Sequence, residues 1–242
     1  QSVSGPLVAM NTILADSLGW IAGKLEGELK NGSDQAEAVI KVLKELMEEH
    51  GNVVFGGDGY SAEWHEMAVS ERGLKNIPTT ADALPALREA SVKKLFESTG
   101  VLTPVELESR FEVYAEQYIL SIDVEAKLVV DIAKTRIYPA AIHYLSDLAK
   151  TSESLAAMGI ELDSSTATVV ANEVNAMMSA VAELIDAMGK HDFTSIEEHM
   201  HFCANEIRSL MDKVRLHADI LETEVADELW PLPKYQEMLF IR

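Results

Sequence analysis

The sequence predicts a mostly α-helical protein, with at most one short strand near residues 53–55. Apolar residues recur at intervals of three and four through most of the chain, which is the period of an amphipathic helix. Hydroxyl or acidic residues that cap helices stand before several of these runs, and glycines stand after them. The 242 residues are 48% hydrophobic and 25% charged, a composition typical of a globular protein with a substantial core.

Two helices are expected before residue 51. Between Pro6 and Lys30 the apolar spacing predicts a helix with a broad buried face, formed by Leu7, Val8, Met10, Ile13, Leu14, Leu18, Ile21 and Leu25. Asn31-Gly32 ends this helix. Ser33-Asp34 then offers a cap for a second helix that reaches His50-Gly51.

A glycine-rich stretch, Gly57 to Ala62, follows the short apolar run at 53–55 and precedes a helix expected from about Ser61 to Arg72. This order is similar to a dinucleotide-binding loop, and a nucleotide enzyme using Gly57 to Ala62 is one alternative. That alternative lacks a second parallel strand and an acidic ribose ligand, and Asp58 would place negative charge where phosphate should lie. A tight turn leading into a helix explains the glycines more simply.

Three long helices are expected after residue 103, arranged up-down-up. Thr103 to Glu106 is a capping box with proline at the first helical position, and the helix continues toward Met158 with a kink at Pro139. Thr194 to Glu197 is predicted to be a second capping box. Heptad seams join the last two helices, with Val170, Val174, Met177, Val181, Leu184 and Met188 on one and Ile196, Met200, Cys203, Ile207, Leu210, Val214, His217 and Leu221 on the other.

Few residues are candidates for chemistry. Glu198 and His201 have the Glu-x-x-His spacing of di-metal bundles, but no second such pair follows, and a solvated acidic face is the simpler interpretation. His199 and His201 point to different sides of a helix. Cys203 and His217 occupy seam positions, where a small buried hydrophobe and a hydrogen-bonded histidine are expected. We therefore predict no catalytic, cofactor-binding or metal-binding residue in this chain.

The formal charge of −20 disfavours nucleic acid and anionic membranes as partners. A single cysteine cannot form an internal disulfide, and no run approaches the roughly 18 apolar residues of a membrane span, so a cytoplasmic setting is expected. The first residue is Gln1 rather than methionine, which suggests a piece of a longer chain.

Several segments together resemble the C-terminal part of the type III glutamine synthetases. Ser2 to Asp16 is similar to the helix after the last catalytic motif of that superfamily, and Ile77 to Leu87 is similar to its later Pro-Thr and Ala-Leu segment. Further similar segments are Gly59 to Trp64, Arg72 to Leu74, Tyr114 to Ile122 before Glu125-Ala126, and Trp230-Pro231-Leu232-Pro233 to Phe240. The resemblance spans nearly the whole chain and is least distinctive between residues about 151 and 225.

The resemblance implies an ATP-dependent ligase that joins glutamate and ammonia, uses Mg or Mn, and forms a ring-shaped homo-oligomer. The family's metal-binding glutamates, Asn-Arg segment and Phe-Glu-Phe-Arg segment have no counterpart here. The resemblance therefore places them in an upstream catalytic segment of the same chain and implies that ATP and metal bind there. This chain alone is then expected to be inactive.

The resemblance also implies a division into two parts. Residues 1–123 would complete the helical flank of the catalytic domain, and residues 124–242 would form a type III-specific helical extension with a C-terminal docking tail. The alternative, from a different class, is an independent acidic helical adaptor that binds a protein partner through an apolar arm. An adaptor should be monodisperse alone, whereas a fragment of the enzyme should expose adhesive apolar surface from Leu7 to Leu25.

Overall fold

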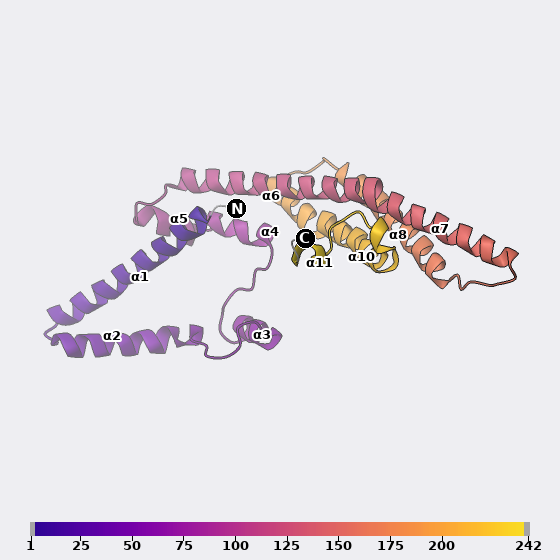
Figure 1. Ribbon diagram of the computed structural model, residues 1–242. Helices are drawn as coiled ribbons and strands as arrows, with labels where there is room; N and C mark the ends of the chain where they lie inside the picture. Colours follow the sequence, from indigo (N-terminus) through magenta and orange to yellow (C-terminus); the bar gives the residue numbers. More distant parts are fainter. Residues whose placement is uncertain (1–2, 240–242) are drawn as a thin grey trace. The chain divides into compact units, whose positions relative to one another are not determined.

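The computed structural model describes residues 3–239, and its regular secondary structure is helical (Figure 1). Phe240, part of the expected docking tail, lies outside the described residues. By their internal contacts the residues form two compact units, which divide between Val113 and Tyr114 within one helix. We call them the N-terminal unit and the C-terminal unit. The functional division after residue 123 stays a prediction, since a contact boundary does not test it.

The N-terminal unit consists of helices of unequal length. Its α-helices are α1 (Ser4–Lys30), α2 (Gln35–His50), α3 (Ala62–Ser70), α4 (Thr80–Ala83), α5 (Ala90–Ser98) and the first part of α6 (Pro104–Ile132). Two 3-10 turns connect them, η1 (Gly51–Val53) and η2 (Leu84–Arg88). The strand considered at 53–55 does not form. Among the described residues no strand exists for it to pair with, and the Val54 N–H instead bonds to the Gly51 carbonyl at 3.0 Å.

The predicted helix starts of this unit are confirmed by their hydrogen bonds. Asp34 accepts from the backbone N–H of Glu37 at 2.9 Å. At the start of α6, Thr103 Oγ1 accepts from the Glu106 N–H at 3.3 Å, and the Glu106 carboxylate accepts from the Thr103 N–H at 2.8 Å. The bonds that the Glu106 carboxylate accepts from the Thr103 N–H and hydroxyl hold the pKa of Glu106 below its usual value, because they favour the charged form.

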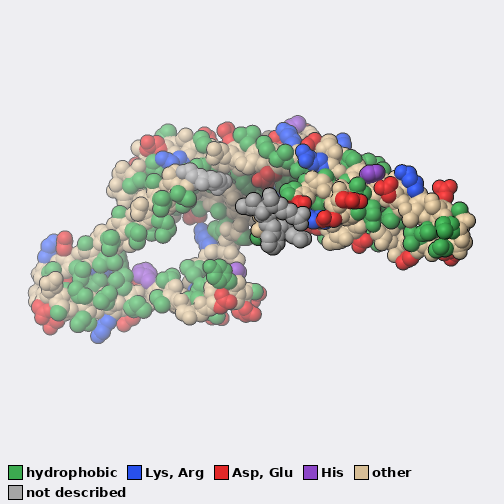
Figure 2. All heavy atoms as spheres, viewed as in Figure 1, with side chains coloured by type: hydrophobic (Ala, Val, Ile, Leu, Met, Phe, Trp, Pro, Cys, Tyr) green, Lys and Arg blue, Asp and Glu red, His purple; other side chains and the backbone are tan. Residues whose placement is uncertain are grey.

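Helix α1 is exposed over most of its surface. Thr12 is its one buried residue among those described. Exposed apolar side chains gather over α1 and α2 (Figure 2), namely Leu7, Met10, Ile13, Leu14, Leu18, Val39, Ile40, Leu43 and Met47. The two helices are joined by ion pairs of Lys24 with Glu45 (3.0 Å) and Lys41 with Glu28 (2.8 Å). Ion pairs between half-exposed side chains contribute little to stability. Because Thr12 alone is buried among its described residues, α1 also has no large core of its own.

The C-terminal unit is a bundle of three long helical segments. The first is the remainder of α6, the π-helical turn η3 (Ala133–Ile137) and α7 (Tyr138–Ala157). The second is α8 (Ser165–Met188). The third is α9 (Ile196–Phe202), the π-helical turn η4 (Cys203–Ile207) and α10 (Arg208–Glu224), followed by η5 (Asp227–Leu229) and α11 (Tyr235–Leu239). The predicted order of three long helices is thereby confirmed.

The core of this unit lies along α8 and α10, which pack together over much of their length. Both predicted seams are confirmed at most positions, because their side chains are buried. The buried members are Val170, Val174, Met177, Val181, Leu184, Met200, Cys203, Ile207, Val214 and Leu221. Met188, Ile196, Leu210 and His217 are only half-buried. His217 Nδ1 lies 2.7 Å from a carboxylate oxygen of Glu173, so this histidine joins α10 to α8.

The irregularity in the first long helix lies just before the proline that predicted it. The Tyr138 N–H bonds to the carbonyl of Ala133, five residues back, and this bond defines the π turn. Pro139 follows with no N–H to donate. The extra residue of the π turn therefore lies just before the position where proline cannot donate the next regular helical hydrogen bond.

The capping box before α9 is shifted by one residue from the prediction. Ser195 is the cap and accepts from the Glu198 N–H at 3.1 Å, and the Glu198 carboxylate accepts from the Thr194 N–H at 2.7 Å. Glu198 therefore takes the role expected of Glu197. The Glu198 carboxylate also accepts from the Thr194 hydroxyl at 2.6 Å. This bond, and secondly the bond from the Thr194 N–H, lower the pKa of Glu198.

Candidate functional site

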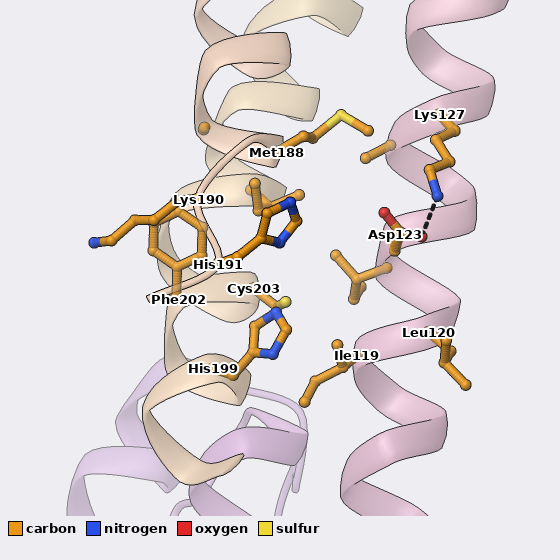
Figure 3. A pocket seen from close by; sticks show the side chains of 14 residues that line it. Ile119, Leu120, Asp123, Lys127, Met188, Lys190, His191, His199, Phe202 and Cys203 are labelled. Atoms are coloured by element: carbon orange, nitrogen blue, oxygen red, sulfur yellow. Dashed lines mark hydrogen bonds and ion pairs between the residues drawn. The ribbon is translucent and has the colours of Figure 1, made fainter. Parts of the chain in front are cut away.

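A cavity of about 280 Å³ lies between α6 and α9 in the C-terminal unit. We call it the α6–α9 cavity. Ile119, Leu120, Asp123 and Lys127 line it from α6. The other wall comes from the end of α8, the connection to α9, and α9 with η4; it carries Met188, Lys190, His191, His199, Phe202 and Cys203 (Figure 3). A shallower groove continues it toward Glu116 and shares Ile119, Leu120, His191 and His199.

The polar groups of the cavity are held by local contacts. Asp123 and Lys127, one turn apart on α6, form an ion pair at 2.6 Å. The ring of His199 stacks on Phe193, with centroids 4.1 Å apart. Lys190 lies over the ring of Phe202 at 4.8 Å. These contacts hold the side chains at the walls of the cavity, where the Asp123 carboxylate projects from α6 toward the wall that carries His199 and Cys203 (Figure 3).

The electrostatics of the cavity do not favour Cys203 as a nucleophile. Burial, and secondly Asp123, raise the pKa of the Cys203 thiol to about 11, so the reactive thiolate is disfavoured. Burial, assisted by neighbouring His191, lowers the pKa of His199 and keeps its imidazole neutral. The Asp123 carboxylate is already paired with Lys127. The cavity can therefore hold an apolar group but offers no activated nucleophile.

The residues weighed from the sequence are only partly brought together. His199 and Cys203 share the α6–α9 cavity, whereas His201 and His217 do not line it. Glu198 serves as a helix cap rather than facing the cavity. Within residues 3–239, no group of three or more His, Cys, Asp and Glu side chains could hold a metal ion. None of the described helices is long and apolar enough to cross a membrane.

Sequence reasoning missed Asp123, Lys127 and His191 as neighbours of His199 and Cys203. Asp123 lies on α6, whereas His191 lies in the connection between α8 and α9. Neither residue stands in a recognisable motif, and only the antiparallel folding of the bundle brings them to one cavity. The linear sequence therefore holds no signal that could have found this grouping.

The glycine stretch of the N-terminal unit is a clamped structural turn. Phe55 stacks on Trp64 at 3.8 Å, and Arg72 covers both rings while donating to the carbonyls of Asn52 (3.2 Å) and Val54 (2.9 Å). A Cβ on Gly57 would lie 2.6 Å from the Phe55 ring, so only glycine fits there.

Two backbone N–H groups at this turn and the start of α3 are also occupied. Asp58 accepts from the Tyr60 N–H at 2.9 Å, and Ser61 caps α3 by accepting from the Trp64 N–H at 3.2 Å. A phosphate-binding loop needs such N–H groups free. This geometry agrees with the simpler interpretation of the glycines as a tight turn.

Comparison of the sequence with known proteins identifies one family. Residues 38–156 match the family model described as the glutamine synthetase C-terminal domain. The type-3 glutamine synthetase of Dictyostelium discoideum is 36% identical over 251 aligned positions, covering 100% of this chain and 34% of the relative. The chain belongs to the glutamine synthetase family and corresponds to its C-terminal region.

Two bacterial glutamine synthetases extend the comparison. That of Bacteroides fragilis is 28% identical and covers 98% of this chain and 34% of the relative. That of Butyrivibrio fibrisolvens is 28% identical and covers 87% of this chain and 31% of the relative. The chain thus spans about a third of the length of these glutamine synthetases. The independent adaptor considered from the sequence is not supported.

Proposed function

We propose that this chain is the C-terminal structural and oligomerisation part of a type III glutamine synthetase, the ATP-dependent ligase that makes glutamine from glutamate and ammonia. The match that covers the whole chain, but only a third of the Dictyostelium relative, carries the proposal. In this proposal ATP and Mg or Mn bind in the catalytic segment that precedes the matched third, and the enzyme works in the cytoplasm as a ring-type homo-oligomer.

The exposed face of α1 supports this assignment. A helix that is apolar on most sides is normally buried, yet Leu14 and Leu18 of α1 are 54% and 64% exposed. A contiguous apolar surface of this kind marks an interaction site. The occupant we propose is the catalytic segment that precedes the matched third in the relatives, so that α1 and α2 form the outer helical flank of the catalytic domain.

The proposal is tested by a chimera in which this chain replaces the C-terminal third of the Dictyostelium type-3 glutamine synthetase. We expect the chimera to form glutamine from glutamate, ammonia and ATP, and the 242-residue chain alone to form none. Turnover by the isolated chain would contradict the proposal, as would a chimera that folds and assembles but lacks activity.

The apolar face is tested in the same chimera. Leu14→Asp with Leu18→Asp should abolish assembly, because two charges would be buried without partners. Asp16→Asn, an exposed position on the same helix, is the matched control and should leave assembly and activity unchanged. Normal assembly of the double aspartate variant would exclude α1 as the buried flank.

A further inference from the structure

The outward side of the first long helical segment in the C-terminal unit is left exposed by the described residues of that unit. Its apolar positions on α6 follow one another at intervals of one helical turn, and they are 53–61% exposed: Leu120, Val124 and Leu128. At the far end of α7, Met158 and Ile160 are 74% and 48% exposed. Between these ends the exposed side chains are mostly charged or polar, together with Tyr138 (38% exposed), Pro139 and Ile142 (41% exposed). We call this surface, residues 120–161 of α6, η3, α7 and the following turn, the outer face.

We propose that the outer face binds the outer face of a second copy of this chain, antiparallel, with residue 131 of one copy facing residue 150 of the other. This inference goes beyond the proposed function and does not depend on the ligase activity. The partner is a second copy because the charges along the outer face are complementary to the same charges read in the opposite direction.

Charge complementarity supports the register. Asp131 and Lys150 are both exposed, and they face each other twice in the two-fold pair. In the same register Lys134 faces Asp147, and Lys127 lies beside Glu153. These pairs add to the ion pairs within each copy, Lys127 with Asp123 and Lys150 with Asp147. No like charges face each other directly along the outer face.

The apolar ends fit the same register. It brings Met158 and Ile160 of one copy over the surface between Leu120 and Val124 of the other. That surface borders the α6–α9 cavity, which Leu120 also lines. The second copy would thus cover both the exposed leucine and the mouth of the cavity.

Other registers fit less well. Sliding the second copy by one helical turn in one direction places Lys127 opposite Lys150, and sliding it in the other direction leaves Asp131 opposite Ser154. Like charges in contact are destabilising, whereas the proposed register has none. The alternation of charge along α6 and α7 therefore selects one alignment.

The size of the contact is that of a modest interface. At 1.5 Å per residue the outer face is about 60 Å long, and a helix is about 10 Å wide. Each copy would then contribute roughly 600 Å², near the lower limit for specific interfaces. The contact is expected to be concentration-dependent unless other surfaces of an oligomer assist it.

Disulfide trapping in the full chain tests the register. Asp131→Cys and Lys150→Cys are made as separate variants, purified, and oxidised alone and mixed. A disulfide needs Cα atoms within about 7 Å, and residues 131 and 150 of one copy lie about 28 Å apart along the helix. The native thiol, Cys203, is buried and should not compete.

We expect a covalent dimer in the mixture and monomer from either variant alone. Absence of the dimer in the mixture would overturn the proposal. Equal cross-linking by the single variants would also overturn it, because this result indicates non-specific association, for instance through α1.

A charge reversal provides a second test by sedimentation equilibrium of the full chain. Asp131→Lys and Lys150→Asp should each weaken self-association at least tenfold, and the double variant should recover it to within about threefold of the original. Asp212→Lys, an exposed position on α10, makes the same charge change and should have no effect. Failure of the double variant to recover association would overturn the pairing, as would binding of a different protein at this face by an otherwise monomeric chain.

Discussion

The two units of this chain differ in how far their apolar side chains are buried. In the C-terminal unit, α8 buries Val170, Met177 and Leu184 completely against neighbouring helices. In the N-terminal unit, α1 is a longer helix with a similar apolar content, yet Thr12 alone is buried among its described residues. The difference indicates that α8 belongs to a self-contained bundle, whereas α1 is built to be covered by another segment.

Two tryptophans, one buried in the C-terminal unit and one exposed on α1, give the test with the largest expected effect. Trp230 of the C-terminal unit is 9% exposed, and Trp20 of α1 is 41% exposed. Trp230→Ala should lower the free energy of unfolding by about 3–5 kcal/mol, because it leaves a cavity. Trp20→Ala should cost about 1 kcal/mol or less in the isolated chain. Urea unfolding measures both.

A conservative variant separates packing from hydrogen bonding at Trp230. The indole Nε1 of Trp230 makes no hydrogen bond with the described residues. Trp230→Phe should therefore retain most of the stability that Trp230→Ala loses. An equal loss in both variants would show that the indole itself, rather than its apolar area, stabilises the unit.

Two leucines sharpen the comparison at a smaller scale. Leu184→Ala, at a fully buried position of α8, should cost about 2–5 kcal/mol. Leu18→Ala, 64% exposed on α1, should change stability by about 0.5 kcal/mol or less. Thermal melts of both variants provide the comparison. If Leu18→Ala were as costly as Leu184→Ala, α1 would already be covered within this chain.

The helix cap of α9 should have a moderate effect. Ser195 accepts from the Glu198 N–H, and Ser195→Ala leaves that donor without its partner. The expected cost is about 1 kcal/mol. Ser154→Ala, an exposed hydroxyl within α7 that bonds to the Lys150 carbonyl, is the control and should be nearly neutral. Guanidinium unfolding of both variants would measure the difference.

The smallest effect concerns pH. The pKa of Glu198 is lowered from its ordinary 4.5 by the bonds from Thr194. Its contribution to stability is therefore fully present above pH 4.5 and is lost as pH falls through the lowered folded-state pKa. The melting temperatures of the original chain and Glu198→Gln should differ at pH 6 and converge at strongly acidic pH. A difference that grew on acidification would contradict this assignment.

The sequence predicted the elements whose signal is local or periodic. Caps at Asp34 and Thr103 and the seams of α8 and α10 were identified because each depends on residues three, four or seven apart. The prediction of a mostly helical fold with at most one short strand is confirmed; the strand left open at 53–55 does not form, since three apolar residues do not show whether a partner strand exists. The cap before α9 was one residue out, because Thr194 and Ser195 are both good caps and Glu197 and Glu198 both acids.

The candidate site was less predictable than the fold. The cavity joins Asp123 of α6 to His199 and Cys203 of the third segment, and this proximity depends on how the long helices are aligned. No spacing in the sequence encodes that alignment directly. The resemblance of segments such as Gly59 to Trp64 identified the family, but it assigned no role to the cavity.

The clamp of Arg72 on Phe55 and Trp64 has a consequence for how this region could evolve. One guanidinium fastens two aromatic rings and two carbonyls, so the turn tolerates little change at any of these positions. Tyr60, at the tip of the same turn, is 96% exposed. This rigid base fixes the place from which the Tyr60 side chain extends and preserves the path of the chain into α3.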